Sequence, residues 1–181
     1  MANHLHKTTL EYRSSWDPQP SDAANWIRNP SLPEGCAAWS DVVVEGDTIR
    51  APNESELAAR AVVALATAKA ARMAAIDTRT AAIIESGSVT VNGVAIYAGL
   101  TNQVSLQALQ QLVTRGVATW PQPISAVGGE AYTITSQADM DRVAGLVATF
   151  VMTAKAAGRT LRAAVLAATT LAEVAAVEDN R

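Results

Sequence analysis

Side chains able to do chemistry are few in this sequence, and they lie far apart. His4 and His6 would share one face of a strand, as a pair of metal ligands can, and Cys36 beside a histidine could act as a nucleophile. However, no third ligand stands at a recognisable spacing from the histidines, and no motif surrounds Cys36. We therefore interpret the histidines as a polar strand surface and Cys36 as a small apolar residue. We expect no catalytic residue, no metal site and no cofactor.

Paired carboxylates and paired glycines also have structural explanations. Glu54 and Glu56 come near the predicted start of one helix, and Asp139 lies near the start of another, where the helix dipole favours negative charge. Gly128-Gly129 belongs to no phosphate-binding loop, because the sequence lacks the Gly-x-x-x-x-Gly-Lys-Ser/Thr pattern. These glycines predict a turn.

Aromatic residues are the more informative set. Three of the four tryptophans lie in the first 52 residues. Tryptophan is enriched where proteins bind each other, but in a region of about 50 residues three tryptophans are also enough to form the core. Both explanations stay open. If this region attaches the chain to a partner, we expect the contact to involve Leu10, Tyr12, Trp16 and Trp26.

The composition predicts helices and argues against two kinds of partner. Alanine makes up roughly a fifth of the 181 residues, above its usual share, and it is the best helix former. The net charge is -3 and no basic face is apparent, so we expect no nucleic-acid binding. The longest nearly apolar run, residues 143–154, is shorter than the roughly 20 residues of a membrane span, and the N-terminus lacks the apolar core of a signal peptide. We therefore expect synthesis in the cytoplasm and no membrane insertion.

A change of composition after residue 52 predicts two modules, 1–52 and 53–181. The first contains five of the seven prolines, the only cysteine and both histidines, whereas the second contains most of the alanine. In the first module, partial alternation predicts a strand within residues 5–16. Residues 39–45 and 48–50 flank a turn sequence and predict a hairpin. We expect this module to be rich in β-structure.

The second module begins with a predicted helix over residues 54–85. Asn53 or Ser55 can cap its N-terminus, and Gly87 ends it. The larger apolar side chains of this helix recur at helical spacing and predict one buried stripe. Its members are Val62, Leu65, Met73, Ile76, Ile83 and Ile84.

Two short hairpins and a short helix follow. Asn92-Gly93 between β-branched residues is a strong hairpin signal, because both turn residues take positive φ. Residues 103–114 predict a helix, and residues 120–125 and 130–135 predict a second hairpin.

The last long helix has the clearest pattern. Ser136-x-x-Asp139 resembles a capping box and predicts a helix from Gln137 to Ala168, and Thr170-x-x-Glu173 predicts a short helix after it. Apolar residues recur every 3.5 positions, as in a coiled coil. This seam comprises Val143, Val147, Phe150, Ala154, Ala157 and Leu161. It has two explanations: packing against the 54–85 helix of the same chain, or pairing with copies of itself.

The predicted fold class is α+β. A small N-terminal β-rich module precedes an Ala-rich helical module with two short β-hairpins and a long C-terminal helix. The regularity of the seam slightly favours self-association, so we expect a homo-oligomer.

The stretch from about Arg72 to Glu178 resembles a domain family of unknown function found at the C-terminal ends of tail-fibre and other virion genes of tailed bacteriophages. The shared pattern is an Arg-bearing helix ending at Gly87, the Val91-Asn92-Gly93-Val94 turn, a polar helix, a Trp-bearing hairpin and a long apolar helix ending in Ala-Ala-Thr-Thr-Leu-Ala-Glu-Val. The segments 4–15 and 25–30 also resemble a leader seen in phage proteins of this kind.

The resemblance implies a structural role without catalysis. It implies a tail- or fibre-associated component of a tailed-phage virion that acts through protein–protein contacts with other virion proteins, located in the tail region of the particle. The alternative is a tail-fibre assembly chaperone that is absent from the mature particle. An enzyme acting on the cell surface would require a carboxylate or Cys/His site that the sequence does not display.

Overall fold

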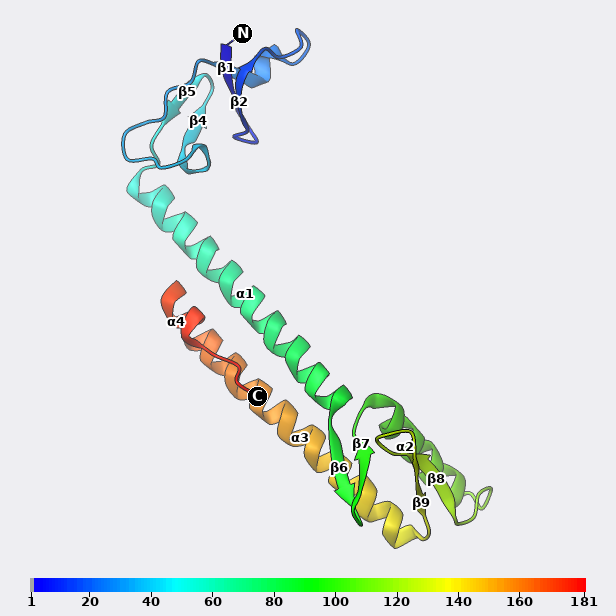
Figure 1. Cartoon of the computed structure of the whole chain (residues 1–181). Coiled ribbons are helices and arrows are strands. Elements are labelled where there is room, and N and C mark those ends of the chain that lie inside the picture. Colours follow the sequence, from blue (N-terminus) through cyan, green and yellow to red (C-terminus); the bar gives the residue numbers. More distant parts are fainter. Residues whose placement is uncertain (1) are drawn as a thin grey trace. The chain divides into compact units, whose positions relative to one another are not determined.

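The computed structural model describes residues 2–181, which form helices and small antiparallel sheets (Figure 1). These elements confirm the predicted α+β class. The chain divides into two compact units, Met1–Ala64 and Leu65–Arg181, and the division falls within helix α1 (Glu54–Ser86). The change of composition lies twelve residues earlier, just before α1 begins. The two units are described separately below.

The first unit contains a three-stranded antiparallel sheet in the order β2-β1-β3. Its strands are β1 (Ala2–His6), β2 (Tyr12–Trp16) and β3 (Trp26–Arg28). One strand was predicted within residues 5–16, but the chain turns back there instead. The Leu10 N–H donates to the His6 carbonyl, and Leu10 takes a positive φ of 56°, which closes the turn between β1 and β2.

A hairpin of β4 (Val43–Glu45) and β5 (Thr48–Arg50) follows in the same unit, as predicted. The predicted first strand is shorter than expected, because residues Trp39–Asp41 form a turn of 3-10 helix. The Asp41 carboxylate accepts hydrogen bonds from the N–H groups of residues 37 and 38, which stabilises that turn. A second 3-10 turn, Ala23–Asn25, precedes β3.

Helix α1 confirms the predicted helix and its cap. Asn53 Oδ1 accepts a hydrogen bond from the Glu56 N–H at 2.9 Å, and Glu56 Oε2 accepts one from the Asn53 N–H at 2.8 Å. This reciprocal pair satisfies two backbone donors that the first turn of a helix leaves free. The predicted apolar stripe is only partly buried: Ile76 is fully buried, but Val62 is 68% exposed.

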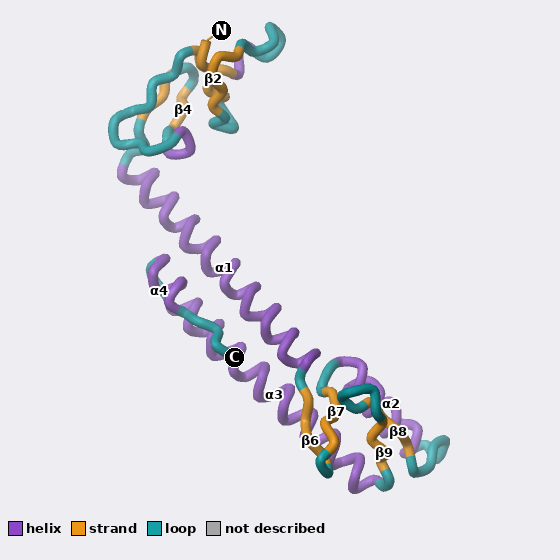
Figure 2. The backbone as a smooth tube through the Cα atoms, viewed as in Figure 1, coloured by secondary structure: helices purple, strands orange, loops and turns teal. Residues whose placement is uncertain are grey.

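The second unit continues with the two predicted hairpins and the short helix (Figure 2). Strands β6 (Ser88–Val91) and β7 (Val94–Tyr97) meet at the Asn92-Gly93 turn, where both residues take positive φ (50° and 82°). Helix α2 (Leu100–Thr114) begins three residues earlier than predicted, and β8 (Gln122–Ser125) pairs with β9 (Ala131–Ile134).

The C-terminal helices start where their capping residues predict. Helix α3 (Gln137–Ala167) begins with the Ser136 hydroxyl accepting from the Asp139 N–H at 3.2 Å. Helix α4 (Leu171–Ala176) begins with a complete capping box between Thr170 and Glu173.

The main core of the second unit is formed by β6–β9, α2 and the first half of α3. Side chains from all of these elements are buried in one cluster, whose members include Ile96, Leu106, Ile134, Met140 and Val143. The core therefore joins both hairpins and α2 to the same face of α3.

Candidate functional site

Trp26 lies between His6 and Trp16 in an aromatic cluster of the first unit. Its side chain is buried (8% exposed), and its indole N–H donates to Asp22 Oδ2 at 2.7 Å. This bond and a second one from Asn25 hold the pKa of the Asp22 carboxyl below its usual range. The Trp16 ring lies 4.6 Å from the Trp26 ring, and His6 contacts Trp26 edge-on at 4.8 Å. Trp26 therefore lies in the core of the first unit. This is one of the two explanations given above for the tryptophans, the other being contact with a partner.

An exposed arginine covers this aromatic cluster. The Arg13 guanidinium lies 4.6 Å from the centre of the Trp16 ring and 5.3 Å from that of Trp26. A cation over an aromatic ring is attracted by the negative face of the ring. Tyr12, 38% exposed, stacks on Trp39 at 5.1 Å, while Leu10 is half-buried in the β1–β2 turn. Of the four residues predicted to contact a partner, Tyr12 presents the most surface.

His4, His6 and Cys36 are the residues whose side chains have metal-binding or nucleophilic chemistry. His6 Nδ1 accepts hydrogen bonds from the N–H groups of Thr8 and Thr9, and His4 is buried with Nε2 4.0 Å from Asp17 Oδ1. Cys36 is half-buried. Within residues 2–181, no group of three or more His, Cys, Asp or Glu side chains is arranged to hold a metal ion.

Glu56 has the largest resolved pKa shift among the carboxylates. Hydrogen bonds from Arg50, and then from the Asn53 backbone, lower the pKa of Glu56 to about 2. Arg50 also bonds Glu45, so one guanidinium ties the β4–β5 hairpin to the first turn of α1. Arg60 on α1 donates to the carbonyls of Asp41 and Val42. Each of these charged side chains therefore has a partner within the first unit.

A second charged network links the hairpins of the second unit to α3. The buried Tyr132 hydroxyl donates to Asp139 Oδ1 at 2.7 Å and accepts from Asn92 Nδ2 at 3.1 Å. Arg142 donates to the same Asp139 oxygen at 2.7 Å. The bond from Tyr132 is the main reason that the pKa of Asp139 is lowered, and burial raises the pKa of Tyr132.

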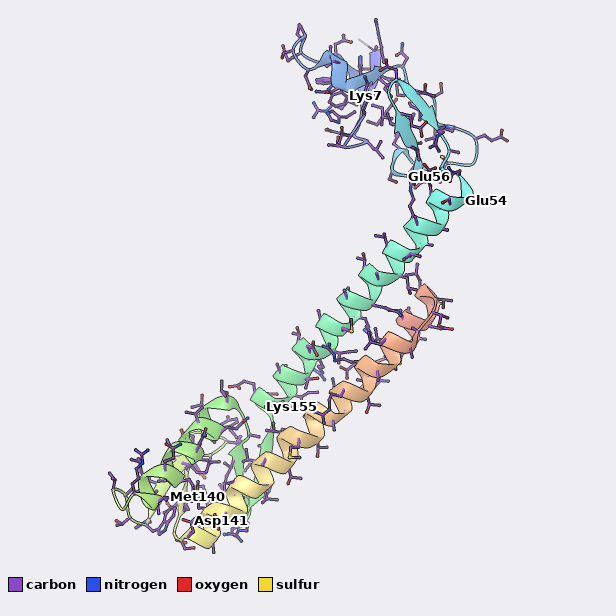
Figure 3. The ribbon with its side chains drawn as sticks, turned by 180° about the vertical axis from the view of Figure 1, so that it is seen from behind. Lys7, Glu54, Glu56, Met140, Asp141 and Lys155 are labelled. Carbon is purple, nitrogen blue, oxygen red and sulfur yellow. The ribbon has the colours of Figure 1, made fainter. Side chains whose placement is uncertain are left out.

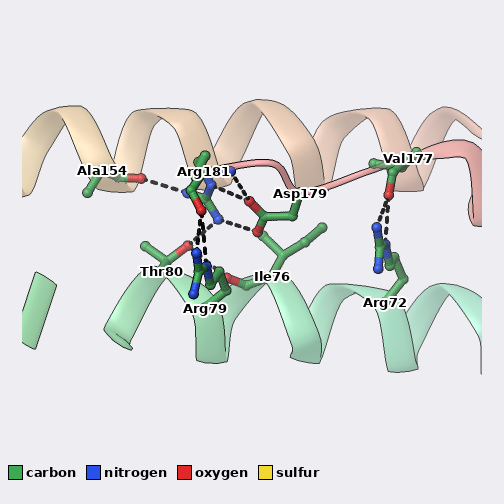
Figure 4. A network of polar contacts seen from close by, with 8 residues as sticks. All are labelled: Arg72, Ile76, Arg79, Thr80, Ala154, Val177, Asp179 and Arg181. Carbon is green, nitrogen blue, oxygen red and sulfur yellow. Dashed lines mark hydrogen bonds and ion pairs between the residues drawn. The ribbon is translucent and has the colours of Figure 1, made fainter. Parts of the chain in front are cut away.

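The C-terminal tail is held by both long helices (Figure 4). Arg72 on α1 donates through two nitrogens to the Val177 carbonyl. The Arg181 guanidinium donates to the Ala154 carbonyl of α3 at 3.1 Å and to Thr80 Oγ1 of α1 at 3.0 Å. Asp179 neutralises Arg181, and this contact lowers the pKa of Asp179. Together these contacts form a clasp that ties the tail to α1 and α3.

The predicted seam on α3 lies inside the chain in this structure. Val143 and Val147 belong to the main core, and Ala154 is buried farther along the helix. Phe150 is half-buried, as are Ala157 and Leu161, and Val151 is the buried residue of that turn. The intrachain explanation expected packing against the 54–85 helix, but Val143 and Val147 are buried mainly with residues of β6–β9 and α2. Pairing of copies through these residues stays a prediction.

A groove between α2 and α3 is a surface that the sequence pattern did not predict. It has a volume of about 500 Å³, with glutamines on α2 forming one wall and small or apolar residues of α3 forming the other. Its lining residues are Gln103, Leu106, Gln107, Gln110, Gln111, Met140, Ala144, Val147, Ala148, Val151 and Met152. None of these side chains is charged. The 103, 107, 110 spacing of the glutamines is the sequence signal that could have located this wall.

Comparison with known proteins adds no relative. No protein-family description, no curated protein and no solved structure matches this chain. Among residues 2–181, no helix combines the length and the apolar character needed to cross a membrane.

Proposed function

We propose that this chain is a structural component of a tailed-phage virion, associated with the tail or a fibre and acting through protein–protein contacts. The observation that supports this most is the surface of α1 at its N-terminal end. Seven of the eight residues from 57 to 64 are apolar, and all eight are exposed, with Val62 at 68% and Val63 at 64%. Helices that are apolar on every side are normally buried, so this segment is suited to contact another protein.

The charged groups support the same proposal. Arg50, Asp139 and Arg181 are each engaged in contacts that hold elements of the fold together. Such paired networks shift pKa values without doing chemistry, whereas an acid–base site needs a group free to exchange protons with a substrate. The chain is therefore proposed to bind other virion proteins, and copies of itself, without turnover.

The decisive experiment is quantitative mass spectrometry of highly purified phage particles from a lysate that contains this chain. A fixed ratio to the tail or portal proteins, retained through a second purification gradient, is the expected result. A chain that is abundant in the lysate but absent from the particles would contradict the proposal and indicate the assembly chaperone instead.

A further inference from the structure

The residues in and beside the groove between α2 and α3 favour one kind of binding partner. We propose that a second copy of this chain docks there, with its α3 antiparallel to the first and a two-fold axis passing beside Ala148. This inference deepens the proposed function, because it assigns the face through which copies of the chain meet. It concerns the second unit alone.

One stripe of α3 borders the groove. Its residues are Asp141, Ala144, Ala148, Met152 and Lys155, which are three or four positions apart. Ala144, Ala148 and Met152 line the groove, and all five residues are exposed except Ala144, which is half-buried. With 3.6 residues per turn, all five lie within about 40° of Ala148 around the helix axis. Met152 is 68% exposed although it is apolar, and Ala148 is exposed as well. Met140, Asp141 and Lys155 are labelled on α3 in Figure 3.

The charges on this stripe are placed for an antiparallel partner. Asp141 and Lys155 each lie seven positions from Ala148, so a two-fold axis there brings Asp141 of each copy opposite Lys155 of the other. The same axis places Ala144 opposite Met152, because each is four positions away. A parallel partner would instead bring Asp141 against Asp141 and Lys155 against Lys155, which repel each other.

Both charges are accessible for such a contact. Lys155 is exposed and forms no ion pair within residues 2–181. Asp141 is also exposed, and its one side-chain hydrogen bond within residues 2–181 is accepted from Gln137 at 2.7 Å. Asp141 therefore retains lone pairs that can accept from a lysine of the second copy.

The shape of the stripe also suits a close helix–helix contact. Ala144 and Ala148 are small, and a Cβ added at the neighbouring Gly145 would meet nothing within 4 Å. Small residues at a helix contact allow the two backbones to approach. Met152 is flexible and fills irregular space, so Met152 of the second copy can occupy the apolar part of the groove.

The glutamine side chains on the α2 side of the groove are suited to contact the same side chains of a second copy. Each carboxamide of Gln103, Gln107 and Gln110 can both donate and accept a hydrogen bond. Identical walls can therefore bond each other or a neighbouring backbone, whereas a wall of like charges would repel its own copy. Charge complementarity along α3 and neutrality along α2 together favour a second copy as the occupant.

The first test is a cysteine cross-link in the full chain. In a Cys36→Ser background, Ala148→Cys places two thiols across the two-fold axis, and mild oxidation is expected to give a disulfide-linked dimer on a non-reducing gel. Ala163→Cys is the matched control, because this exposed alanine lies 15 residues, or about 22 Å, along α3 from the axis. Equal cross-linking at both positions, or none at position 148, would overturn the proposal.

The second test reverses the charges and follows the oligomeric state by sedimentation velocity. The unmodified chain is expected to be a dimer. Asp141→Lys and Lys155→Asp are each expected to weaken the dimer by roughly tenfold or more, because each puts like charges together twice. The double variant restores opposite charges and is expected to recover the dimer.

If the unmodified chain is a monomer, the inference is overturned and the groove would belong to a different partner. If the single variants associate as well as the unmodified chain, the inference is overturned as well. This result is separable from a failure of the proposed function. Absence of the chain from phage particles would leave the dimer intact, whereas a monomer found at a fixed ratio in particles would remove the dimer and leave the virion role.

Discussion

At the scale of single residues, the Tyr132 hydroxyl joins a hairpin to the start of α3. Tyr132→Phe removes the hydroxyl and leaves Asp139 and Asn92 each without one partner. Loss of a buried hydrogen bond to a charged group costs about 1.5–3 kcal/mol, and we expect the free energy of unfolding to fall by that order. Urea denaturation followed by circular dichroism measures it. An unchanged midpoint would show that water replaces the hydroxyl.

The same residue also sets part of the acid sensitivity. The pKa of Asp139 is lower in the folded chain than its ordinary value, chiefly through the Tyr132 hydrogen bond. A lowered folded pKa contributes stability above the unfolded pKa, near 4, and this contribution is lost as the pH falls through the folded value. Tyr132→Phe should therefore reduce the difference in unfolding free energy between pH 6 and pH 3. An unaltered difference would assign the acid sensitivity to other carboxylates, such as Glu56.

Gly158 is a residue whose lack of a side chain matters. A Cβ at this position would lie 2.6 Å from Thr80 Oγ1 on α1 and 3.3 Å from the Arg181 guanidinium. We expect Gly158→Ala to lower the melting temperature by separating α3 from α1 and loosening the tail, at a cost of about 1–3 kcal/mol. Gly145→Ala is the matched control, because its Cβ would be in open space and alanine stabilises a helix interior by up to about 1 kcal/mol. Equal effects at both glycines would contradict the close approach at Gly158.

At the scale of elements, the tail after α4 depends on arginines of α1. Arg72→Ala removes both hydrogen bonds to the Val177 carbonyl. We expect hydrogen exchange to become faster by roughly tenfold in residues 171–181, while α3 keeps its protection. Mass spectrometry of peptides from the exchanged protein measures this. Arg115→Ala, which changes an exposed arginine far from the tail, is expected to leave the exchange unchanged. Unchanged exchange in Arg72→Ala would show that the other contacts, such as those of Arg181 with Ala154 and Thr80, hold the tail without Arg72.

Elements whose signals are local in the sequence could be predicted, and contacts between distant elements could not. The Ser136 and Thr170 caps and the Asn92-Gly93 turn each depend on residues within four positions of one another, so sequence alone locates them. Arg72 and Val177 are 105 positions apart, and no local pattern connects them. The face of α3 was predicted to include Phe150, whereas Val151 is buried, because the neighbouring elements decide which residue of that turn points inward.

The groove between α2 and α3 also combines a local sequence pattern with contacts between distant elements. On α3, Asp141 and Lys155 lie seven positions either side of Ala148 and outside the lining of the groove, a spacing that the sequence displays. The other wall of the groove comes from α2, which is brought there by the β8–β9 hairpin and the core around Met140. A groove requires both walls, so it could be recognised only after the fold was known. The Arg13 contact with Trp16 and Trp26 is similar, since it needs the β1–β2 turn.

At the scale of the whole molecule, two units with separate cores predict separable unfolding. Trp26 is buried in the first unit, and the main apolar cluster lies in the second. We expect Trp26→Ala to destabilise the first unit by about 3–5 kcal/mol, as truncation of a buried aromatic residue does. Trp16 and Trp39 lie in that unit, so their fluorescence should change at lower denaturant concentration. The helical signal in circular dichroism, to which the second unit contributes most, should keep its midpoint.

Whether the two units unfold separately decides which substitutions can test attachment of the chain to a virion. Leu32→Ala changes a 40% exposed residue of the first unit and is expected to leave both signals unchanged. If fluorescence and circular dichroism shift together in Trp26→Ala, the two units unfold as one, and a loss of particle incorporation in that variant could not be assigned to the first unit. If only fluorescence shifts, substitutions at exposed Tyr12 and Arg13, which leave Trp26 in place, become the appropriate probes of attachment through this unit.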